Sequence, residues 1–501
     1  MSALTDLLRP FSNLLAGRSV LSIGPGTESV RRFLEKAGAE VAGTAAGVPV
    51  GTGMTTKFDF VVWVFSGGQG TLADRCAEIA GALKDEGSLL MATENPLGIS
   101  RSLGSASCDP NHAEALDSGK HELVCRLTEA GLTNIDFYYP FPDMNGPSVL
   151  LDERAFETPA FDLGNLIEPT AGCEGNALSL PAKKLMQLLI SNGLIMEHCN
   201  SFFLVASRRK TRLLPKEILG FCFNGSRMIE YNKMNVFYLT GDNTIMVRRV
   251  PYEPDIRAKP GLPIVQELSE ERYLPGRLYT LVLESILETS GWTVADLRAW
   301  AAPYWTLLQQ YADEEGRVEG RYIDLAPFNL LLYNGSLSAV DLEWTAQGCL
   351  PVKYVFFRGL YHSLARVPAV RPPAVGTPTN FYRLILAVAE TLFSDTGGLL
   401  ETFLHLEPFY FGAVFPGSGR FPPDRDLPVV TVTAGCASEE ATAWRVGLCP
   451  LLACDLQVFV ETADGAFSEE KSTTLRIALT PQRRIHSVPL PWFTKDILRL
   501  R

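Results

Sequence analysis

The sequence lacks any long hydrophobic run. No stretch approaches the roughly eighteen consecutive apolar residues that identify a membrane-spanning helix. Residues 1–6 have neither the basic segment nor the apolar segment of a secretory signal. We therefore expect neither a spanning helix nor export, which predicts a cytoplasmic protein.

Patterns for metal binding and disulfides are also missing. The ten cysteines include no Cys-x-x-Cys pair, and the six histidines form no His-Glu-x-x-His motif. A chain of this length can bury enough core to be stable without disulfides, so we expect reduced thiols. The same spacings argue against a zinc site.

Positive charge is in deficit. The formal net charge is -11 and the pI is about 5.3, which argues against nucleic acid as the main partner. A composition that is 46% hydrophobic and 20% charged is typical of a soluble protein with buried cores. The length of 501 residues predicts about three domains. Linker-like composition places them at residues 1–212, 213–418 and 419–501.

Residues 1–212 alternate between apolar strands and helical segments. The run Val20–Ile23 leads into Gly24-Pro25-Gly26, and apolar residues then recur at helical spacing from Val30 to Ala37. Further strands are expected at 39–44, 58–65, 88–92, 134–139 and 201–206. This order predicts a doubly wound, Rossmann-like α/β sheet with a glycine turn after its first strand.

The glycine turn resembles the first motif of class I S-adenosylmethionine-dependent methyltransferases. Residues 94–98, 137–143 and 147–151 extend the resemblance to methyltransferase domains of bacterial cell-surface polysaccharide assembly proteins. The resemblance implies that Gly24 and Gly26 approach S-adenosylmethionine through their backbone N–H groups.

Two features depart from that family. The second strand ends at Thr44, where such sites place an acid for the ribose hydroxyls. Only the thirteen residues 45–57 separate it from the next strand, too few for a helix–strand–helix crossover. We interpret the domain as a methyltransferase derivative that has lost its cofactor, and a working methyltransferase is the alternative.

Residues 213–418 carry the second chemical pattern. Short strands at 218–223, 235–240 and 243–249 precede a predicted helical region that holds Glu267. Asp324 and Asn329 then stand at the two ends of one loop, and a hairpin with an Asn-Gly turn leads to Asp341. The hairpin can bring these three side chains together. Phosphoryl transfer needs such a set, with one carboxylate near the attacking hydroxyl and a carboxamide and a second carboxylate on Mg²⁺.

Asp324-Leu-x-x-x-Asn329 followed by Asp341 resembles the catalytic and metal loops of protein-kinase-like phosphotransferases. With Glu343-Trp344 and Phe357-Arg-Gly359, the segment is similar to bifunctional methyltransferase/kinase proteins that cap or modify bacterial O-antigen polysaccharides. The resemblance implies a bilobal domain that uses ATP and Mg²⁺. It implies Asp324 as the catalytic base, and Asn329, Asp341 and Glu343 as metal ligands.

The resemblance also implies a nucleotide-anchoring lysine on the strand at 244–250. The sequence offers Arg248 or Arg249 there, with Glu267 as a helix partner. The planar guanidinium of arginine is not equivalent to the lysine ammonium. No glycine-rich loop is evident before that strand.

Residues 419–501 read as a β-rich module. Strands expected at 429–433, 455–461, 472–479 and 485–490 are separated by turn residues, which predicts a small antiparallel β-sandwich. Because Arg501 falls inside an expected strand, we expect the natural polypeptide to continue, perhaps not alone but into a glycosyltransferase.

Three functions follow from these patterns. The first is an ATP- and Mg²⁺-dependent phosphotransferase acting on a glycan hydroxyl. The second is a non-catalytic scaffold in glycan assembly, and the third is a glycan methyltransferase that uses S-adenosylmethionine. The resemblance implies a lipid-linked or nascent glycan and glycosyltransferases of the same pathway as partners, and peripheral association with the inner membrane.

Overall fold

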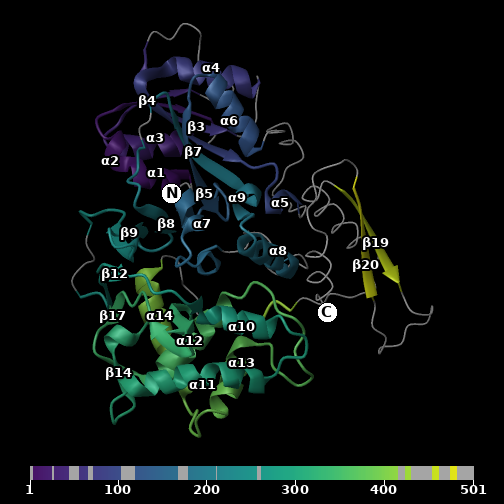
Figure 1. Cartoon of the computed structure of the whole chain (residues 1–501). Helices are drawn as coiled ribbons and strands as arrows, with labels where there is room; N and C mark the ends of the chain where they lie inside the picture. Colours follow the sequence, from purple (N-terminus) through teal and green to yellow (C-terminus); the bar gives the residue numbers. More distant parts are fainter. Residues whose placement is uncertain are drawn as a thin grey trace.

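The computed structural model describes residues 4–24, 27–44, 56–65, 71–102, 119–167, 179–209, 212–256, 261–415, 424–429, 454–461 and 474–481. A large sheet flanked by helices forms the upper part of the molecule in Figure 1, and a helical lobe lies below it. The helices around the sheet are α1 (Leu4–Leu8), α2 (Ser12–Leu15), α3 (Thr27–Lys36), α4 (Leu72–Ala82), α5 (Ile99–Ser102), α6 (Lys120–Glu129), α7 (Glu153–Glu157), α8 (Ser179–Ser191) and α9 (Ile195–His198).

The sheet has eleven strands in the order β12-β10-β9-β8-β6-β5-β7-β4-β3-β1-β2. Strands β2, β1, β3 and β4 run parallel, and β7 and every later neighbour pair antiparallel. Their bounds are β1 (Ser19–Ile23), β2 (Glu40–Thr44), β3 (Phe58–Phe65), β4 (Leu83–Glu94), β5 (Asn134–Phe141), β6 (Val149–Asp152), β7 (Ser201–Ser207), β8 (Ile218–Asn224), β9 (Lys233–Leu239), β10 (Ile245–Pro251) and β12 (Glu271–Arg272).

Both faces of the parallel part are covered. Alternate residues of β3 point to opposite faces, so Phe60 packs with Phe11 and Leu34 while Trp63 packs with Ile79 of α4. Strands buried on both faces read as continuous apolar runs, as β3 does. The structure confirms the predicted Rossmann-like sheet in the first part of the chain, as a mixed sheet.

The edge of the sheet at β2 bears on the missing crossover. The strand that follows β2 in the described chain is β3, and it pairs with the opposite side of β1. Residues 45–55, which connect them, lie outside the described residues. No described strand extends the sheet beyond β2, as expected from the short connection.

The sheet continues across the predicted domain boundary at residue 212. Val149 of β6 pairs with Cys222 of β8, so β8, β9 and β10 extend the first sheet. Phe237 and Val247 belong to the same hydrophobic cluster as the first part of the chain. The boundaries stay a prediction, but packing joins β8–β10 to the first part more closely than their position in the sequence indicates.

The helical lobe has its own core, which extends from Tyr231 to Leu427. Its helices are α10 (Tyr279–Leu287), α11 (Val294–Tyr311), α12 (Val352–Ala365), α13 (Phe381–Glu390) and α14 (Leu399–Val414). Thr293 and Asp296 form a capping box that starts α11. Helices α11 and α12 approach closely, because an added Cβ at Gly359 would lie 2.3 Å from the Tyr304 hydroxyl.

Short strands connect the lobe to the sheet. They are β11 (Ile264–Gln266), β13 (Arg277–Leu278), β14 (Arg317–Glu319), β15 (Leu330–Tyr333), β16 (Ser336–Ala339), β17 (Trp344–Ala346) and β18 (Cys349–Pro351). The predicted helix around Glu267 is wrong. Residues 264–266 pair with β17, and residues 271–272 pair with β10. The β-branched Ile264 and Val265 favour a strand, and this pairing satisfies their backbone groups.

The C-terminal region is described only in part. Strands β19 (Cys454–Glu461) and β20 (Thr474–Pro481) pair antiparallel along their whole length, which agrees with two of the predicted strands. Residues 430–433 and 485–490, expected to form two more, lie outside the described residues. The β-sandwich therefore stays a prediction.

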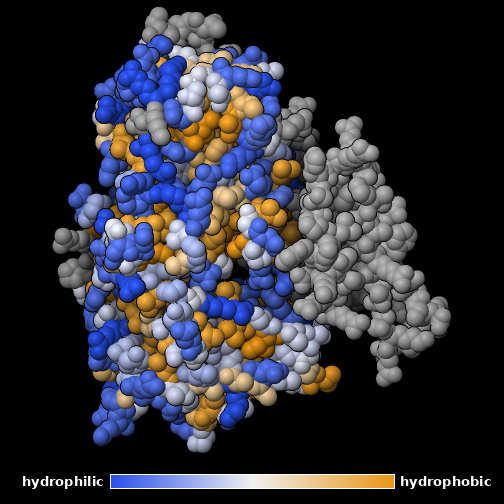
Figure 2. Space-filling model, in the orientation of Figure 1, coloured by the Kyte–Doolittle hydropathy of each residue, from blue (hydrophilic) through white to orange (hydrophobic). Residues whose placement is uncertain are grey.

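The surface is mixed. On the face shown in Figure 2, hydrophobic residues lie in several separate areas among hydrophilic ones. Within the part of the chain that the structure describes, no helix is long and apolar enough to cross a bilayer.

Candidate functional site

Asp324 and Asn329 are held together at the end of a short loop. The Asn329 Nδ2 donates to the backbone oxygen of Asp324 at 3.0 Å and to its Oδ2 at 2.7 Å. The loop closes through a single 3-10 turn, η6 (Pro327–Asn329), in which the Asn329 N–H donates to Ala326 O at 2.7 Å. Both side chains belong to residues that are 8% exposed. The structure thus brings together two of the three predicted site residues.

A third residue, missed in the sequence interpretation, fixes Asp324 from the interior. Arg358 of α12 donates from NH1 to Asp324 Oδ1 at 2.8 Å and to Ile323 O at 3.0 Å. Its Nε lies 3.2 Å from Glu407 Oε2, and Glu407 is fully buried. The motif Phe357-Arg-Gly359 contributed to the family resemblance but indicated no role for Arg358.

Glu407 in turn collects three groups from one face of α12. It accepts from the Tyr354 hydroxyl and from His362 Nε2, each at 2.8 Å, and it pairs with Arg358. Tyr354, Arg358 and His362 are spaced four residues apart, so they share a face of the helix. A buried carboxylate needs such partners to remain ionised.

The hairpin delivers Asp341 to the same end. Leu330 of β15 pairs with Ala339 of β16, and the Val340 N–H donates to Asn329 O at 2.9 Å. Asn334 and Gly335 turn the chain with φ of 49° and 78°, as the Asn-Gly signal predicts. Asp341 itself has φ of 52°, a left-handed conformation that costs energy in a residue other than glycine.

Two cations from the sheet hold Asp341. Arg249 contacts Asp341 Oδ1 from Nε at 3.0 Å and from NH2 at 2.8 Å, and Lys233 Nζ lies 3.2 Å from the same oxygen. The Lys233 and Arg249 side chains are 0% and 2% exposed, whereas that of Asp341 is 35% exposed. Burial alone would raise the pKa of the Asp341 carboxyl, but the charges of Lys233 and Arg249 hold it below its ordinary value.

Glu343 occupies a different environment. Its Oε1 pairs with Arg227 at 2.8 Å, and its Oε2 pairs with Lys233 at 2.5 Å and accepts from Gln266 at 3.1 Å. Its side chain is only 1% exposed. Both oxygens are therefore engaged, which disagrees with the role of metal ligand implied by the resemblance and fits that of a buried structural anion.

The two candidate arginines face opposite sides of β10. Arg249 reaches Asp341 and Glu271, while Arg248 is exposed and contacts Glu270 and Tyr238. Alternation along a strand explains the separation. Glu267 pairs with neither arginine; the acids that do so, Glu270 and Glu271, follow it by three and four residues.

Lys233 and Arg227 are the charged groups that sequence reasoning missed here. Both precede the strand where a cation was expected, and nothing local distinguishes them. A lysine inside the run Lys233–Leu239, at a position that ladder pairing buries, was the one available signal.

A divalent cation fits this arrangement in part. Among the described residues, no group of three or more His, Cys, Asp or Glu side chains is placed to hold a metal ion. Asn329 Oδ1 and Asp341 Oδ2 nevertheless accept no hydrogen bond from the described residues. Mg²⁺ commonly uses one or two protein oxygens together with substrate phosphates, so this pair suits it.

The glycine turn of the first part serves packing. Gly24 has φ of 111°, and an added Cβ there would lie 2.1 Å from Val64 O of β3. Gly26 lies outside the described residues, and β2 ends at Gly43-Thr44 without an acid. The described residues thus provide the turn for S-adenosylmethionine but no carboxylate for its ribose at this position.

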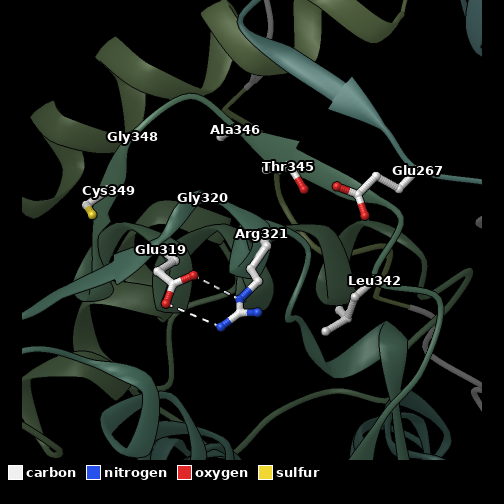
Figure 3. Close-up of a pocket in the computed structure, with 9 residues that line it drawn as sticks. All are labelled: Glu267, Glu319, Gly320, Arg321, Leu342, Thr345, Ala346, Gly348 and Cys349. Atoms are coloured by element: carbon white, nitrogen blue, oxygen red, sulfur yellow. Dashed lines mark hydrogen bonds and ion pairs between the residues drawn. The ribbon is translucent and has the colours of Figure 1, made fainter.

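A pocket of about 540 Å³ lies beside the Asp341 segment (Figure 3). Its walls include Leu342 and Thr345, the ion pair of Glu319 with Arg321, and the side chain of Glu267. The sequence gave no indication of this pocket, because its residues come from three separate segments.

No family model matches the chain, and no curated protein matches it. Solved structures of methyltransferases are similar to its first part at low identity. An S-adenosylmethionine-dependent methyltransferase from Archaeoglobus fulgidus is 15% identical, with 40% of this chain and 91% of that chain covered and a TM-score of 0.28. One from Thermotoga maritima is 14% identical, with 41% and 91% covered and a TM-score of 0.25. One from Streptomyces caelestis is 14% identical, with 41% and 88% covered and a TM-score of 0.24.

Proposed function

We propose that residues 213–418 form a phosphotransferase that moves a phosphoryl group from ATP to a hydroxyl of a cell-surface glycan. The observation that carries the proposal is the convergence of one loop and one hairpin. Asn329 clamps Asp324, and the backbone pairing of residue 340 with Asn329 sets Asp341 beside them. The kinase resemblance in the sequence supports the same assignment.

Each side chain then has a defined task. The Asp324 carboxylate accepts the proton of the glycan hydroxyl as that oxygen bonds to the γ-phosphorus. The bond from this phosphorus to the β,γ-bridging oxygen breaks, and ADP leaves with that oxygen. Arg358 keeps the Asp324 carboxylate oriented during the transfer.

Asn329 Oδ1 and Asp341 Oδ2 would hold Mg²⁺, which supplies charge neutralisation on the phosphates when it is bound. Arg249 and Lys233 place two buried positive charges against Asp341, where phosphate oxygens would also be stabilised. Glu343 keeps Lys233 charged in this buried position.

Transfer from γ-labelled ATP to lipid-linked glycans tests the proposal. Asp324→Asn is expected to lower the rate by about 10²–10⁴-fold, because it removes the proton acceptor while it preserves shape. Arg249→Ala should also abolish transfer, and the matched control Arg248→Ala, on the exposed side of the same strand, should not. If the wild-type protein neither transfers label nor binds ATP with Mg²⁺, the proposal is wrong and the non-catalytic scaffold takes its place.

A second candidate is methyl transfer to the glycan by the first part of the chain. It is supported by the methyltransferase-like, Rossmann-type mixed sheet with its glycine turn at Gly24. Calorimetric titration with S-adenosylmethionine is the test. Heat of binding that saturates at one site would support this function, and a flat titration at millimolar cofactor would remove it.

The location and partners belong to the same proposal. A cytoplasmic protein that modifies a lipid-linked glycan meets its substrate at the inner membrane, beside the glycosyltransferases of that pathway. Co-sedimentation of the protein with vesicles that carry the lipid-linked glycan, compared with vesicles that lack it, measures this association.

A further inference from the structure

The 540 Å³ pocket beside Asp341 is large enough for a ligand and has no role in the phosphate chemistry described above. It lies between the 3-10 turn η5 (Gly320–Tyr322), the strands β17 and β18, and Glu267 (Figure 3). An added Cβ at Gly320 would lie 1.9 Å from Ala346 O, so the turn and β17 are in close backbone contact at the pocket floor.

The walls of the pocket belong to the segments that carry the reactive groups. The turn η5 ends at Tyr322, and Asp324 follows it by two residues. Leu342 follows Asp341 directly and lines the pocket. The chain from 341 to 345 therefore has Asp341 and Glu343 on the ion-paired side and Leu342 and Thr345 on the pocket side.

The lining combines hydrogen-bond acceptors and donors around a small apolar surface. Glu267 and Glu319 present carboxylates, Arg321 presents a guanidinium, and Thr345 presents a hydroxyl. Leu342 provides apolar contact. Sugar hydroxyls both donate and accept hydrogen bonds, so they can use both kinds of group, whereas an anion would meet two carboxylates and an amine would meet the guanidinium.

From this lining we infer that the pocket binds one neutral sugar unit of the acceptor glycan, away from the hydroxyl that reacts. The inference rests on the proposed phosphotransfer only for the identity of the glycan as substrate. Binding energy gathered at a remote unit can position the reacting hydroxyl near Asp324.

An exposed thiol at the pocket gives a readout that is independent of catalysis. Cys349 lines the pocket, while Cys125 lies on α6, far along the chain. Iodoacetamide labelling of each cysteine, followed by peptide mass spectrometry, can be measured with methyl glycosides of glucose, mannose and galactose. At about ten times the dissociation constant, the correct sugar should slow labelling of Cys349 about tenfold and leave Cys125 unchanged.

Variants at exposed positions keep the test separate from folding. Glu267→Gln and Arg321→Ala should each weaken the protection about tenfold, the loss of one charge-assisted hydrogen bond. Glu314→Gln, exposed on the neighbouring turn and outside the pocket, is the matched control and should change nothing.

The outcomes distinguish this inference from the proposed function. Protection of Cys349 without any phosphate transfer supports the pocket and removes the phosphotransferase. Phosphate transfer with no protection by any of the three glycosides, and with KM for the glycan unchanged in Glu267→Gln, overturns the pocket. Protection by glucosamine or inorganic phosphate alone overturns it too, because a charged ligand is then the occupant.

Discussion

The Arg358 guanidinium joins two carboxylates, donating to Asp324 Oδ1 at 2.8 Å while its Nε lies 3.2 Å from Glu407 Oε2. Glu407 is fully buried, and Asp324 is almost so. The orientation of the residue proposed as catalytic base thus depends on a carboxylate 83 positions later in the sequence. The helical lobe and the candidate site are therefore coupled through one side chain.

Removing Arg358 should destabilise the lobe severely. Arg358→Met leaves Asp324 and Glu407 buried without their cation, which typically costs about 3–5 kcal/mol in the free energy of unfolding. Urea unfolding of the variant measures the loss. Arg383→Met, exposed on α13, is the control and should stay within about 0.5 kcal/mol of wild type. A small effect at Arg358 would mean that the two carboxylates are not buried as described.

The stability of the lobe should fall in acid. Burial lowers the pKa of His362 below its ordinary 6.5, although Glu407 opposes this shift. Burial alone would raise the pKa of Glu407, but Arg358 and the bond from His362 lower it to about 2, from an ordinary 4.5. Both folded-state values lie below the unfolded ones, so the unfolded chain binds more protons as the pH falls.

The urea midpoint should therefore be constant above about pH 7, decrease below about pH 6.5 as His362 takes up a proton on unfolding, and decrease further below about pH 4.5. His362→Gln should remove the first of these two decreases and retain the second. A midpoint that increases as the pH falls from 7 to 5 would contradict the environment described for His362.

Asp341 and Glu343 should separate activity from stability. Glu343→Gln weakens the pairing of the fully buried Lys233 and should cost up to about 3 kcal/mol in the free energy of unfolding. Asp341→Asn, at a side chain that is 35% exposed, should cost less and should abolish phosphate transfer. Thermal unfolding and the labelled-ATP assay, run on both variants, compare the two effects. The reverse order would exchange the roles assigned to the two acids.

Gly320 should not tolerate a side chain. An added Cβ would lie 1.9 Å from Ala346 O, so Gly320→Ala should shift the backbone and cost at least about 1–3 kcal/mol. Gly241→Ala, where a Cβ meets nothing within 4 Å, should be neutral or slightly stabilising. Melting temperatures of the two variants give the comparison, and equal values would argue against the close contact at the pocket floor.

Local patterns in the sequence identified much of this structure. The apolar runs of β1, β3 and β7 and the Asn334-Gly335 turn were predicted because they depend on neighbouring residues. The pairing of Asp324 with Asn329 was predicted for the same reason, since five residues separate them.

Features set by tertiary contacts were missed. Lys233, Arg227 and Glu407 are single charged residues whose roles come from partners about 50 to 120 positions away. The stretch around Glu267 has enough polar residues to suggest a helix, but pairing of residues 264–266 with β17 decided otherwise. The continuation of the sheet through β6 and β8 also depends on pairing between distant segments.

Calorimetric titration of ATP with Mg²⁺ into the intact chain tests the central claim most directly. The account predicts saturable binding at one site that requires Mg²⁺, is lost in Asp341→Asn and Arg249→Ala, and is retained in Arg248→Ala. Binding that is absent from the wild-type protein, or that persists unchanged in Asp341→Asn, would contradict it.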